Sequence, residues 1–436
     1  MTYLDTDKQT KADLSITEGI YNELPLFFLY TGAETKNGKR MMQAWISSPL
    51  SDISIIRKRQ EAIAWEGLPE IPLDEEELDF IEYYLDYRDQ ITRPNRLLSF
   101  ATIIDRRFIR YDPKRYVIRR GVNLVIRLLR ELEVLRKNTP KDAPLLLREM
   151  AQNIQDSIYA TELEVVIPEI EAGKRALSNF LIDKYDYLFR CVRVATIRGL
   201  LGELYLLDVC RTAQRVARNR NFCCTPEMVQ TTEFSISDFT HPYIKEGRSN
   251  NWKMTNGNIC ILTGSNMAGK TTTLKAITLA VWLAHCGLPV PARAMTCPVF
   301  DGIYTSINLP DSLRDGRSHF LAEILRIKEV LQKAAAGKRC LIILDEMFRG
   351  TNAEDAFESS VSVNNLLKEY RDCSFLISTH ILEYAKTFGK DAACCFYYMD
   401  SKIENDEFVC SYQLFEGVSE TKVGYWLVKT KLKDLI

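Results

Sequence analysis

Residues 262–273 read Leu-Thr-Gly-Ser-Asn-Met-Ala-Gly-Lys-Thr-Thr-Thr. They contain the pattern G-x-x-x-x-G-K-[ST], which forms a phosphate-binding loop when it joins a strand to a helix. Residues 259–262 before it are a short apolar run, typical of a buried strand. Residues 272–286 after it carry apolar side chains at helical spacing and stop at Gly287. This order of strand, glycine-rich turn and helix predicts a nucleotide site rather than a chance match.

The loop itself supplies the predicted binding residues. Its backbone N–H groups and the N-terminus of the following helix face an anion. We expect Lys270 to reach the outer phosphates and the Thr271 hydroxyl to ligate Mg²⁺. The full predicted ATP-binding set is Gly264, Ser265, Asn266, Met267, Ala268, Gly269, Lys270, Thr271 and Thr272.

The composition is that of an ordinary globular protein. The 436 residues suffice for two or three domains, and 46% of them are apolar and 26% charged. No apolar run approaches the roughly 18 residues of a membrane span, and the N-terminus lacks the pattern of an export signal. All twelve cysteines lie from Cys191 onward without zinc-site spacing. We therefore expect reduced cysteines and a cytoplasmic protein that does not contact a membrane.

The character of the chain changes near residue 220. Before that point the pattern is mostly helical, and after it short apolar runs alternate with helical stretches, as in an α/β sheet domain. The pattern predicts helices over residues 51–66, 73–91, 113–137, 145–181 (kinked at Pro168) and 185–217. The sequence therefore predicts a helical arm of about 220 residues followed by a nucleotide-binding domain of similar size.

A second motif lies 75 residues downstream of Lys270, where an apolar run over residues 340–344 ends in Asp345 and Glu346. An apolar strand that ends in two acids is typical of a Walker B element. We expect Asp345 to hold the Mg²⁺ hydration shell and Glu346 to orient and polarise the attacking water. A buried strand with two terminal acids is common by itself, but its pairing with the loop in one domain favours an ATPase.

Two further signals concern the γ-phosphate. Residues 377–380 read as a short strand that ends in His380, which could reach that phosphate or serve only a structural role. Ser318 follows Gly316 directly before a predicted helix over residues 320–336, and so begins a second anion-binding helix N-terminus. Because the loop already binds phosphate, we expect Ser318 to serve a nucleotide on another subunit. The alternative is an ordinary helix cap.

Together these motifs resemble those of the MutS family of DNA mismatch-repair ATPases. The segments that carry the resemblance are residues 240–244, 263–272, 289–292, 316–323, 344–352 and 378–380. The pair Asn266-Met267 and the run Arg349-Gly350-Thr351 make it more specific than a bare Walker pair. Upstream, residues 9–14 and 38–50 resemble the start of the family's helical core, or lever, domain.

The resemblance implies a fold and a set of roles. The fold would be an α-helical N-terminal arm, residues 1–220, followed by an α/β P-loop NTPase domain of the ABC-like type, residues 221–436. Asn266 and Lys270 would contact the outer phosphates, and His380 would sense the γ-phosphate. Ser318 would complete the site of a partner subunit in a homodimer that forms on ATP binding. Residues 349–352 would form a loop that communicates between the two sites.

The sequence also departs from the family pattern. Ser265 and Ala268 replace the usual Pro and Gly, but both are small, so phosphate binding should survive. Phe348 replaces a usual Gly, which affects the detailed geometry between subunits. Nothing that resembles the mismatch-reading and connector domains precedes the helical arm, so we expect a short form of the family.

A basic segment is the candidate DNA contact. The net charge of the chain is −1, but residues 86–148 hold sixteen Lys and Arg against seven Asp and Glu, a net of +9. This segment could follow a duplex phosphate backbone or be a solvated helical face. We expect an ATP-dependent DNA-binding protein of repair or recombination; the alternative is an ATPase module that acts on a protein partner. A metabolic kinase is disfavoured, because Glu346 favours water as the nucleophile.

Overall fold

The computed structural model describes residues 2–18, 24–88, 113–172, 176–244, 247–255, 257–265, 267–307, 319–335, 337–404 and 407–418. The chain divides into two compact units, which are both discontinuous in sequence. The sheet unit comprises residues 1–30, 44–60 and 215–436, and the helical unit comprises residues 31–43 and 61–214. No described helix is both long and apolar enough to cross a membrane. All twelve cysteines lie in the described ranges, and all are free thiols.

The sheet unit is built around a six-stranded sheet in the order β10-β9-β4-β8-β7-β6. Four of its neighbouring strand pairs are parallel, and β10 pairs with β9 in the antiparallel sense. The strands are β4 (Ile259–Thr263), β6 (Gly302–Ser306), β7 (Cys340–Asp345), β8 (Ser374–Thr379), β9 (Cys394–Glu404) and β10 (Glu407–Glu416). Every residue of β4 and β7 is buried, as expected for parallel strands covered on both faces. The strands predicted over residues 259–262 and 340–344 are therefore confirmed.

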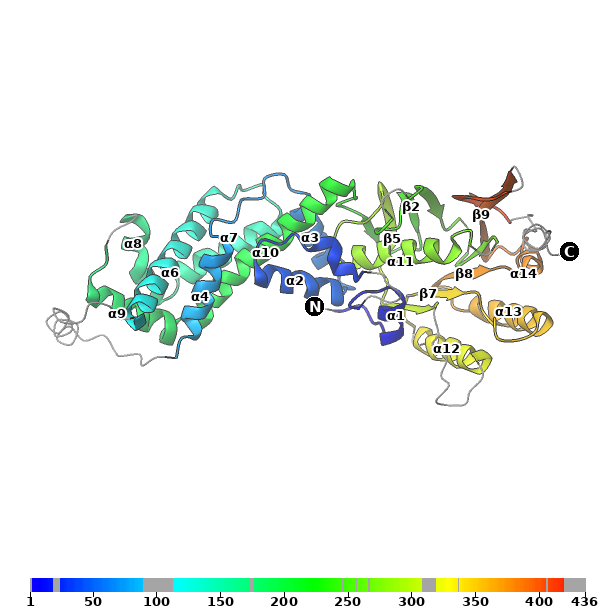
Figure 1. The fold of residues 1–436 in the computed structure, drawn as a ribbon, viewed down its shortest axis with the longest axis horizontal. Helices are drawn as coiled ribbons and strands as arrows, with labels where there is room; N and C mark the ends of the chain where they lie inside the picture. Colours follow the sequence, from blue (N-terminus) through cyan, green and yellow to red (C-terminus); the bar gives the residue numbers. More distant parts are fainter. Residues whose placement is uncertain are drawn as a thin grey trace. The chain divides into compact units, whose positions relative to one another are not determined.

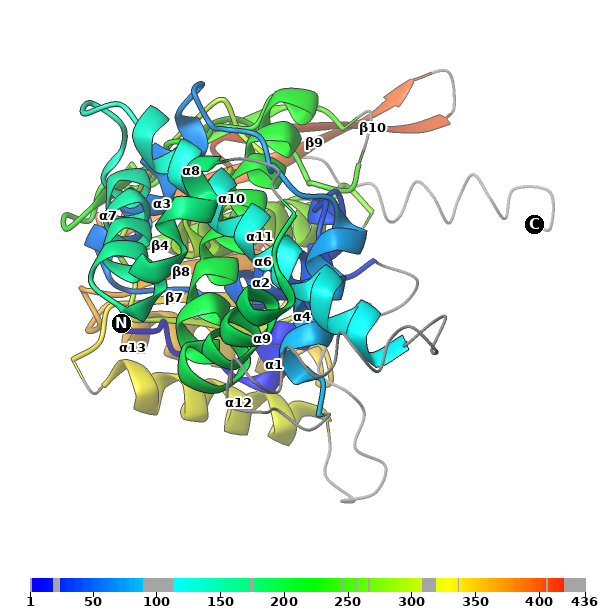
Figure 2. The same ribbon diagram turned by 90° about the vertical axis from the view of Figure 1, so that its left-hand side faces the viewer.

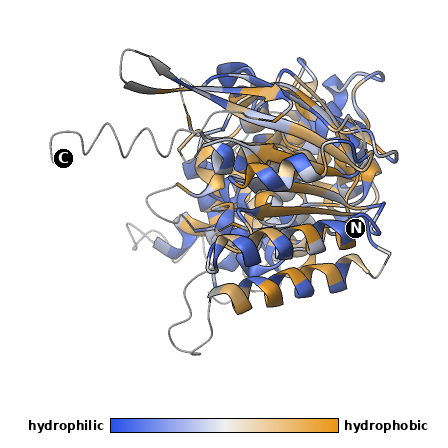
Figure 3. Cartoon of the chain, turned by 90° about the vertical axis from the view of Figure 1, so that its right-hand side faces the viewer, coloured by the Kyte–Doolittle hydropathy of each residue, from blue (hydrophilic) through white to orange (hydrophobic). Residues whose placement is uncertain are grey.

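Helices cover both faces of this sheet (Figures 1 and 2). Helix α11 (Lys270–Cys286) packs against β7 and β8 on one face. On the other face, α12 (His319–Ala334), α13 (Ala353–Leu367) and α14 (Leu382–Thr387) share a core with β4, β7 and β8. Figure 3 shows mainly apolar strands between helices whose faces are mixed in polarity.

A smaller sheet completes this unit. Its order is β1-β5-β2-β3, formed by β1 (Glu227–Val229), β2 (Ser235–Phe239), β3 (Asn250–Lys253) and β5 (Ala294–Pro298). Phe234, next to β2, packs its ring edge against Trp252 of β3 with centroids 4.6 Å apart. Helix α11 also contacts β2, so this helix lies between the two sheets.

The start of the chain belongs to the sheet unit. It contains α1 (Lys8–Asp13), the 3₁₀ turn η1 (Leu26–Tyr30) and parts of α2 (Lys36–Ser47) and α3 (Ile53–Ala64). Two buried side chains of α11 bind it: Trp282 Nε1 donates to the Ile46 carbonyl at 2.8 Å, and His285 Nδ1 lies 2.7 Å from the Leu50 carbonyl. The sequence predicted a single division of the chain near residue 220. In the structure, these long-range contacts join residues 1–30 and 44–60 to the sheet unit instead.

The helical unit contains α4 (Glu75–Asp86), α6 (Pro113–Asn138), α7 (Leu145–Tyr159), η2 (Glu162–Val166), α8 (Ile167–Ala172), α9 (Asn179–Tyr187), the π turn η3 (Leu188–Val192) and most of α10 (Val194–Arg220). Helix α6 packs against α4, α7, α8 and α9, so its apolar stripe forms the centre of this unit. The helix predicted over residues 113–137 is confirmed.

Two predicted long helices are wrong because the chain breaks within them. The prediction over residues 145–181 is interrupted after Tyr159, where the Thr161 hydroxyl accepts from the Leu163 N–H and caps η2. Pro168 lies in the first turn of α8, a position that tolerates proline, rather than at a kink. The prediction over residues 185–217 fails at Arg193, whose N–H bonds the Leu188 carbonyl and closes the π turn.

Candidate nucleotide-binding site

The glycine-rich loop joins the carboxyl end of β4 to the N-terminus of α11. Gly264 has φ +145° and Gly269 has φ +98°, conformations that side-chain-bearing residues rarely adopt. A Cβ at Gly264 would also approach the Met399 carbonyl oxygen to 3.2 Å. Ala268 is fully buried, whereas Met267 is 82% exposed. Asn266 lies outside the described residues.

Lys270 folds back into this loop. Its Nζ donates to the carbonyl oxygens of Gly264 (2.9 Å) and Ser265 (3.1 Å) and lies 3.0 Å from Glu346 Oε1. The side chain is only 3% exposed. An ammonium so deeply buried needs compensating partners, and an anion in the loop could replace them.

Three oxygen-bearing side chains meet beside Lys270. The Thr271 hydroxyl donates to Asp345 Oδ2 at 2.7 Å, and the Ser378 hydroxyl donates to Asp345 Oδ1. Because Asp345 ends β7 and Ser378 lies on the neighbouring β8, parallel pairing brings them together. Hydroxyl and carboxylate oxygens are the ligands that Mg²⁺ prefers. Thr271 and Asp345 therefore fit the predicted metal-holding pair.

Glu346 follows β7 in a left-handed conformation, φ +48°. Its N–H lies 3.1 Å from both the carbonyl and the hydroxyl oxygen of Ser378, which fixes the turn. Its Oε2 lies 2.8 Å from Arg349 and 3.5 Å from His380 Nδ1. Burial raises the pKa of Glu346, but the hydrogen bond from His380 and the charges of Lys270 and Arg349 outweigh it and lower the pKa to about 2.

Two cavities adjoin the loop and share Met267, Gly269 and Thr272 in their walls. The first, of about 610 Å³, is also lined by Lys270, Thr271, Glu346, Arg349 and His380. The second, of about 450 Å³, has a more apolar lining that includes Phe239, His241, Ile244, Met399 and Tyr412. A charged cavity for phosphates beside an apolar cavity for a base is the division that a nucleotide requires.

The apolar cavity was not predictable from the loop motif. Tyr243, in the segment 240–244, does not line it, and its hydroxyl donates to the Pro25 carbonyl at 2.6 Å. Tyr412 does line it and is half exposed, at φ +54° in a bulge of β10. Nothing in the local sequence distinguished Tyr412 from other strand tyrosines. Ser378 was also missed as a contact, although a serine at the end of a buried strand is a usable signal.

The loop after Glu346 contains the unusual Phe348. This residue has φ +64°, the left-handed region that a glycine would adopt without strain. Its side chain is 2% exposed, and its ring lies 5.4 Å from that of Phe320 in the first turn of α12. Apolar burial therefore holds a phenylalanine in this conformation. Asn352 closes the loop as the N-cap of α13, accepting from the Asp355 N–H at 2.9 Å. Ser318 lies outside the described residues.

Arginines of the basic segment are engaged within the helical unit. Only residues 86–88 and 113–148 of that segment are described. The pairs on α6 are Arg115 with Asp183, Arg120 with Glu76, Arg127 with Glu77, and Arg136 with Glu133. Arg130 donates to the carbonyls of Glu169 and Ile170. A phosphate backbone that used this face would have to displace these partners, although exposed pairs are individually weak.

Comparison with known proteins finds similarity to one family. The model of the MutS domain V family matches residues 260–432. The DNA mismatch repair protein MutS of Shouchella clausii (strain KSM-K16) is 29% identical over 243 residues, which are 54% of this chain and 28% of that protein. Proteins of the same name from Petrotoga mobilis and Aquifex pyrophilus are 31% and 28% identical, over 51% and 67% of this chain.

The chain spans only part of these relatives, between 28% and 34% of their length. The matched domain includes β4, α11, β7 and β8, which carry the described residues of the candidate site. Residues 260–432 are therefore similar to MutS domain V, and the chain is similar to MutS proteins over half to two thirds of its length.

Proposed function

We propose that this chain is a MutS-type ATPase that hydrolyses ATP to ADP and phosphate. The observation that carries the proposal is the convergence of Lys270, Thr271, Asp345, Glu346 and His380 at the carboxyl ends of β4, β7 and β8. A lysine for phosphate, an oxygen pair for a cation and a carboxylate for water are the parts that phosphoryl transfer requires. The sheet unit would be an α/β P-loop NTPase domain of the ABC-like type, and the helical unit would correspond to the core, or lever, domain.

ATP would occupy both cavities. Its phosphates would lie against the loop and the α11 N-terminus, with Lys270 exchanging its carbonyl partners for phosphate oxygens. Its adenine would enter the apolar cavity, where Tyr412 offers an exposed aromatic face and His241 and Ile244 line the wall. The shared wall around Gly269 and Thr272 is where the two parts of the nucleotide would join.

Thr271 and Asp345 would hold the Mg²⁺ that accompanies the phosphates. The fit rests on their two oxygens, which lie 2.7 Å apart, on Thr271 lining the charged cavity, and on the second hydrogen bond by which Ser378 orients the carboxylate. When bound, the cation would neutralise charge on the phosphate oxygens.

Glu346 would activate the attacking water. With a pKa of about 2 it is a weak base while Lys270 is its partner. Phosphate that attracts Lys270 removes one of its three cationic or hydrogen-bonding neighbours, so its pKa rises and it becomes a better base. His380, 3.5 Å from the same carboxylate and half exposed, would lie between Glu346 and the γ-phosphate. Basicity would thus appear only after ATP is in place.

A second subunit would complete the site. Ser318 directly precedes α12 in the sequence and would bind the γ-phosphate of a partner's ATP, so that ATP joins a homodimer. In keeping with the names of the relatives, the dimer would use this cycle to change its grip on DNA in repair or recombination. The alternative is a protein partner, and a gel-shift series at increasing salt decides: no shifted DNA at low salt would contradict direct DNA binding.

The rates of ATP hydrolysis by the wild type, Lys270→Ala and Glu346→Gln test the proposed ATPase activity directly. We expect Lys270→Ala to lose ATP binding, because the phosphates lose their cation. We expect Glu346→Gln to bind ATP but to hydrolyse it at least a hundredfold more slowly, because the amide cannot accept a proton from water. Phosphate release and binding of a fluorescent ATP analogue are the measurements. Wild-type turnover by Glu346→Gln would contradict its role.

A further inference from the structure

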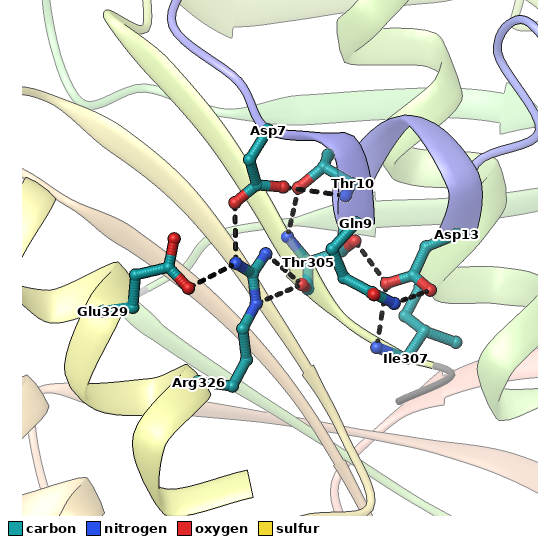
Figure 4. Close-up of polar contacts among 8 residues, drawn as sticks. All are labelled: Asp7, Gln9, Thr10, Asp13, Thr305, Ile307, Arg326 and Glu329. Atoms are coloured by element: carbon teal, nitrogen blue, oxygen red, sulfur yellow. Dashed lines mark hydrogen bonds and ion pairs between the residues drawn. The ribbon is translucent and has the colours of Figure 1, made fainter. Parts of the chain in front are cut away.

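Side chains from other segments bind the chain at both edges of the six-stranded sheet, whose edge strands are β6 and β10. An edge strand presents backbone N–H and C=O groups that have no neighbouring strand to pair with. At the β6 edge, Asp13 of α1 accepts at Oδ2 from the Thr305 hydroxyl (2.6 Å) and from the Ile307 N–H (3.1 Å) (Figure 4). At the β10 edge, the side chain of Asn250 binds the backbone.

Asn250, the first residue of β3, binds the bulge of β10 at two points. Its Oδ1 accepts from the Leu414 N–H at 2.7 Å, and its Nδ2 donates to the Tyr412 carbonyl at 3.1 Å. The amide thus offers one acceptor and one donor, as a peptide group of a neighbouring strand would. Backbone groups that the bulge takes out of the ladder therefore keep hydrogen-bond partners.

Ser411 ties the same bulge to β9. Its hydroxyl donates to the Asp400 carbonyl at 3.1 Å and accepts from the Gln413 N–H at 3.2 Å. A bulge sets extra residues opposite the partner strand and interrupts the ladder, so its backbone needs other partners. Asn250 and Ser411 supply them and connect the bulge to β3 and to β9, respectively.

The bulge decides where the ring of Tyr412 lies. At φ +54° this residue is in the left-handed region, which a tyrosine keeps only where its surroundings hold it. The ring lies against the glycine-rich loop, because a Cβ built at Gly269 would be 3.4 Å from Tyr412 Cδ1. Tyr412 and Asn250 both line the apolar cavity beside that loop.

We propose that Asn250 is a positioning residue for recognition of the base, because it holds the bulge in which Tyr412 faces the adenine of ATP. The inference rests on the proposed function of the apolar cavity. Without the amide, the Tyr412 carbonyl and the Leu414 N–H lose their partner on β3, and the left-handed conformation loses support. The ring would then face the cavity for only part of the time, and the affinity for the base would fall in the same proportion.

Two substitutions remove this support at a half-buried position without leaving a large cavity. Asn250→Ala loses both hydrogen bonds. Asn250→Asp keeps an acceptor for the Leu414 N–H but sets a second carboxylate oxygen against the Tyr412 carbonyl. We expect either variant to bind ATP about fivefold more weakly than the wild type.

Asn251→Ala is the matched control in the same strand. The Asn251 side chain also binds backbone, since its Oδ1 accepts from the Asp238 N–H at 2.9 Å. Asn251 is not among the described residues that line the two cavities. We expect this variant to bind ATP within about twofold of wild type, because the bulge keeps both of its bonds to Asn250.

A second ligand gives a readout that general damage to the fold cannot produce. Inorganic triphosphate resembles the phosphates of ATP but has no base. We expect Asn250→Ala and Asn250→Asp to bind it within about twofold of wild type, because the charged cavity is unchanged. Isothermal titration with ATP and with inorganic triphosphate is the measurement. An equal loss of affinity for both ligands would overturn the inference.

The double variant Asn250→Ala/Tyr412→Ala tests whether Asn250 acts through the ring. If it does, removal of the amide has no further effect once the ring is absent. We then expect the double variant to bind ATP within about twofold of Tyr412→Ala. Losses that multiply would overturn the positioning role, because Asn250 would then affect the nucleotide independently of the ring.

The single variants separate the remaining failures. Wild-type ATP affinity of Asn250→Ala and Asn250→Asp, with Tyr412→Ala weakened, would overturn the positioning role and leave the adenine site intact. Wild-type ATP affinity of Tyr412→Ala would overturn the adenine site itself, and this inference with it.

Discussion

Glu346 illustrates how individual residues prepare the site. Its carboxylate is bound by Lys270, Arg349 and His380, and its N–H is fixed by Ser378. The same contacts that orient Glu346 keep its pKa at about 2 and so suppress its basicity. A base that is oriented but weak without phosphate would limit hydrolysis to the complete complex. In the proposed function, this chemistry would link ATP binding to catalysis.

The pKa of Glu346 predicts a pH-dependent contribution to stability. The folded pKa of about 2 lies below the ordinary value of 4.5, so the ionised contacts stabilise the fold above about pH 4.5. This contribution is lost as the pH falls towards about 2. We expect Glu346→Gln to melt below the wild type at about pH 7, and the difference to shrink between about pH 5 and pH 3, because the carboxyl of the unfolded chain takes up protons over this range while that of the folded chain stays ionised.

The melting temperatures of both proteins across this range are the measurement. Glu358→Gln, at an exposed position of α13, is the control and should follow the wild type at every pH. A difference between wild type and Glu346→Gln that stays constant down to about pH 3 would contradict the lowered pKa.

Among the elements, the β9–β10 hairpin contributes an unexpected part of the site (Figure 2). Its register shifts between Cys410 and Leu414, and Tyr412 lies in that bulge at φ +54°. A bulge redirects a side chain that would otherwise alternate with its neighbours. Tyr412 is thereby brought to the wall of the apolar cavity, which Met267 and Gly269 of the glycine-rich loop also line.

Truncation of this tyrosine tests the adenine site. We expect Tyr412→Ala to weaken ATP binding by about tenfold or more, since stacking of a base on an aromatic ring is worth roughly 1–3 kcal/mol. Tyr412→Phe keeps the ring and should bind ATP within about twofold of wild type. Titration with ATP is the measurement, and equal affinities of the two variants would exclude stacking on this ring.

Local patterns predicted some elements well and others poorly. The apolar stripe of α6 and the buried run of β7 were sufficient to predict these two elements, because the stripe of α6 is long and the run of β7 is uniformly apolar. The breaks at Thr161 and Arg193 depend on a single cap and a single π turn within otherwise helical patterns. The loop motif indicated Lys270 and its neighbours, since their chemistry is encoded locally. Tyr412 reaches the cavity through a bulge in the β9–β10 hairpin, and the bonds of Ser378 arise from strand pairing across 33 residues, so neither was visible in the local sequence.

At the scale of the whole molecule, the two units share the chain in an interleaved order. Residues 1–30 and 44–60 belong with the sheet, while residues 31–43 and 61–214 form the helical unit. Composition cannot reveal this, because the N-terminal helices look like the rest of the helical half and only long-range contacts assign them. One such contact joins Asp13 to Thr305, almost 300 residues away. The start of the chain is therefore part of the proposed ATPase.

The central claim is that ATP joins two copies of this site, and sedimentation of Glu346→Gln tests it most directly. Because this variant should bind ATP without hydrolysing it, we expect ATP with Mg²⁺ to raise its dimer fraction, while Lys270→Ala stays unchanged by ATP. An unchanged oligomeric state of Glu346→Gln, with ATP shown to be bound, would contradict the account.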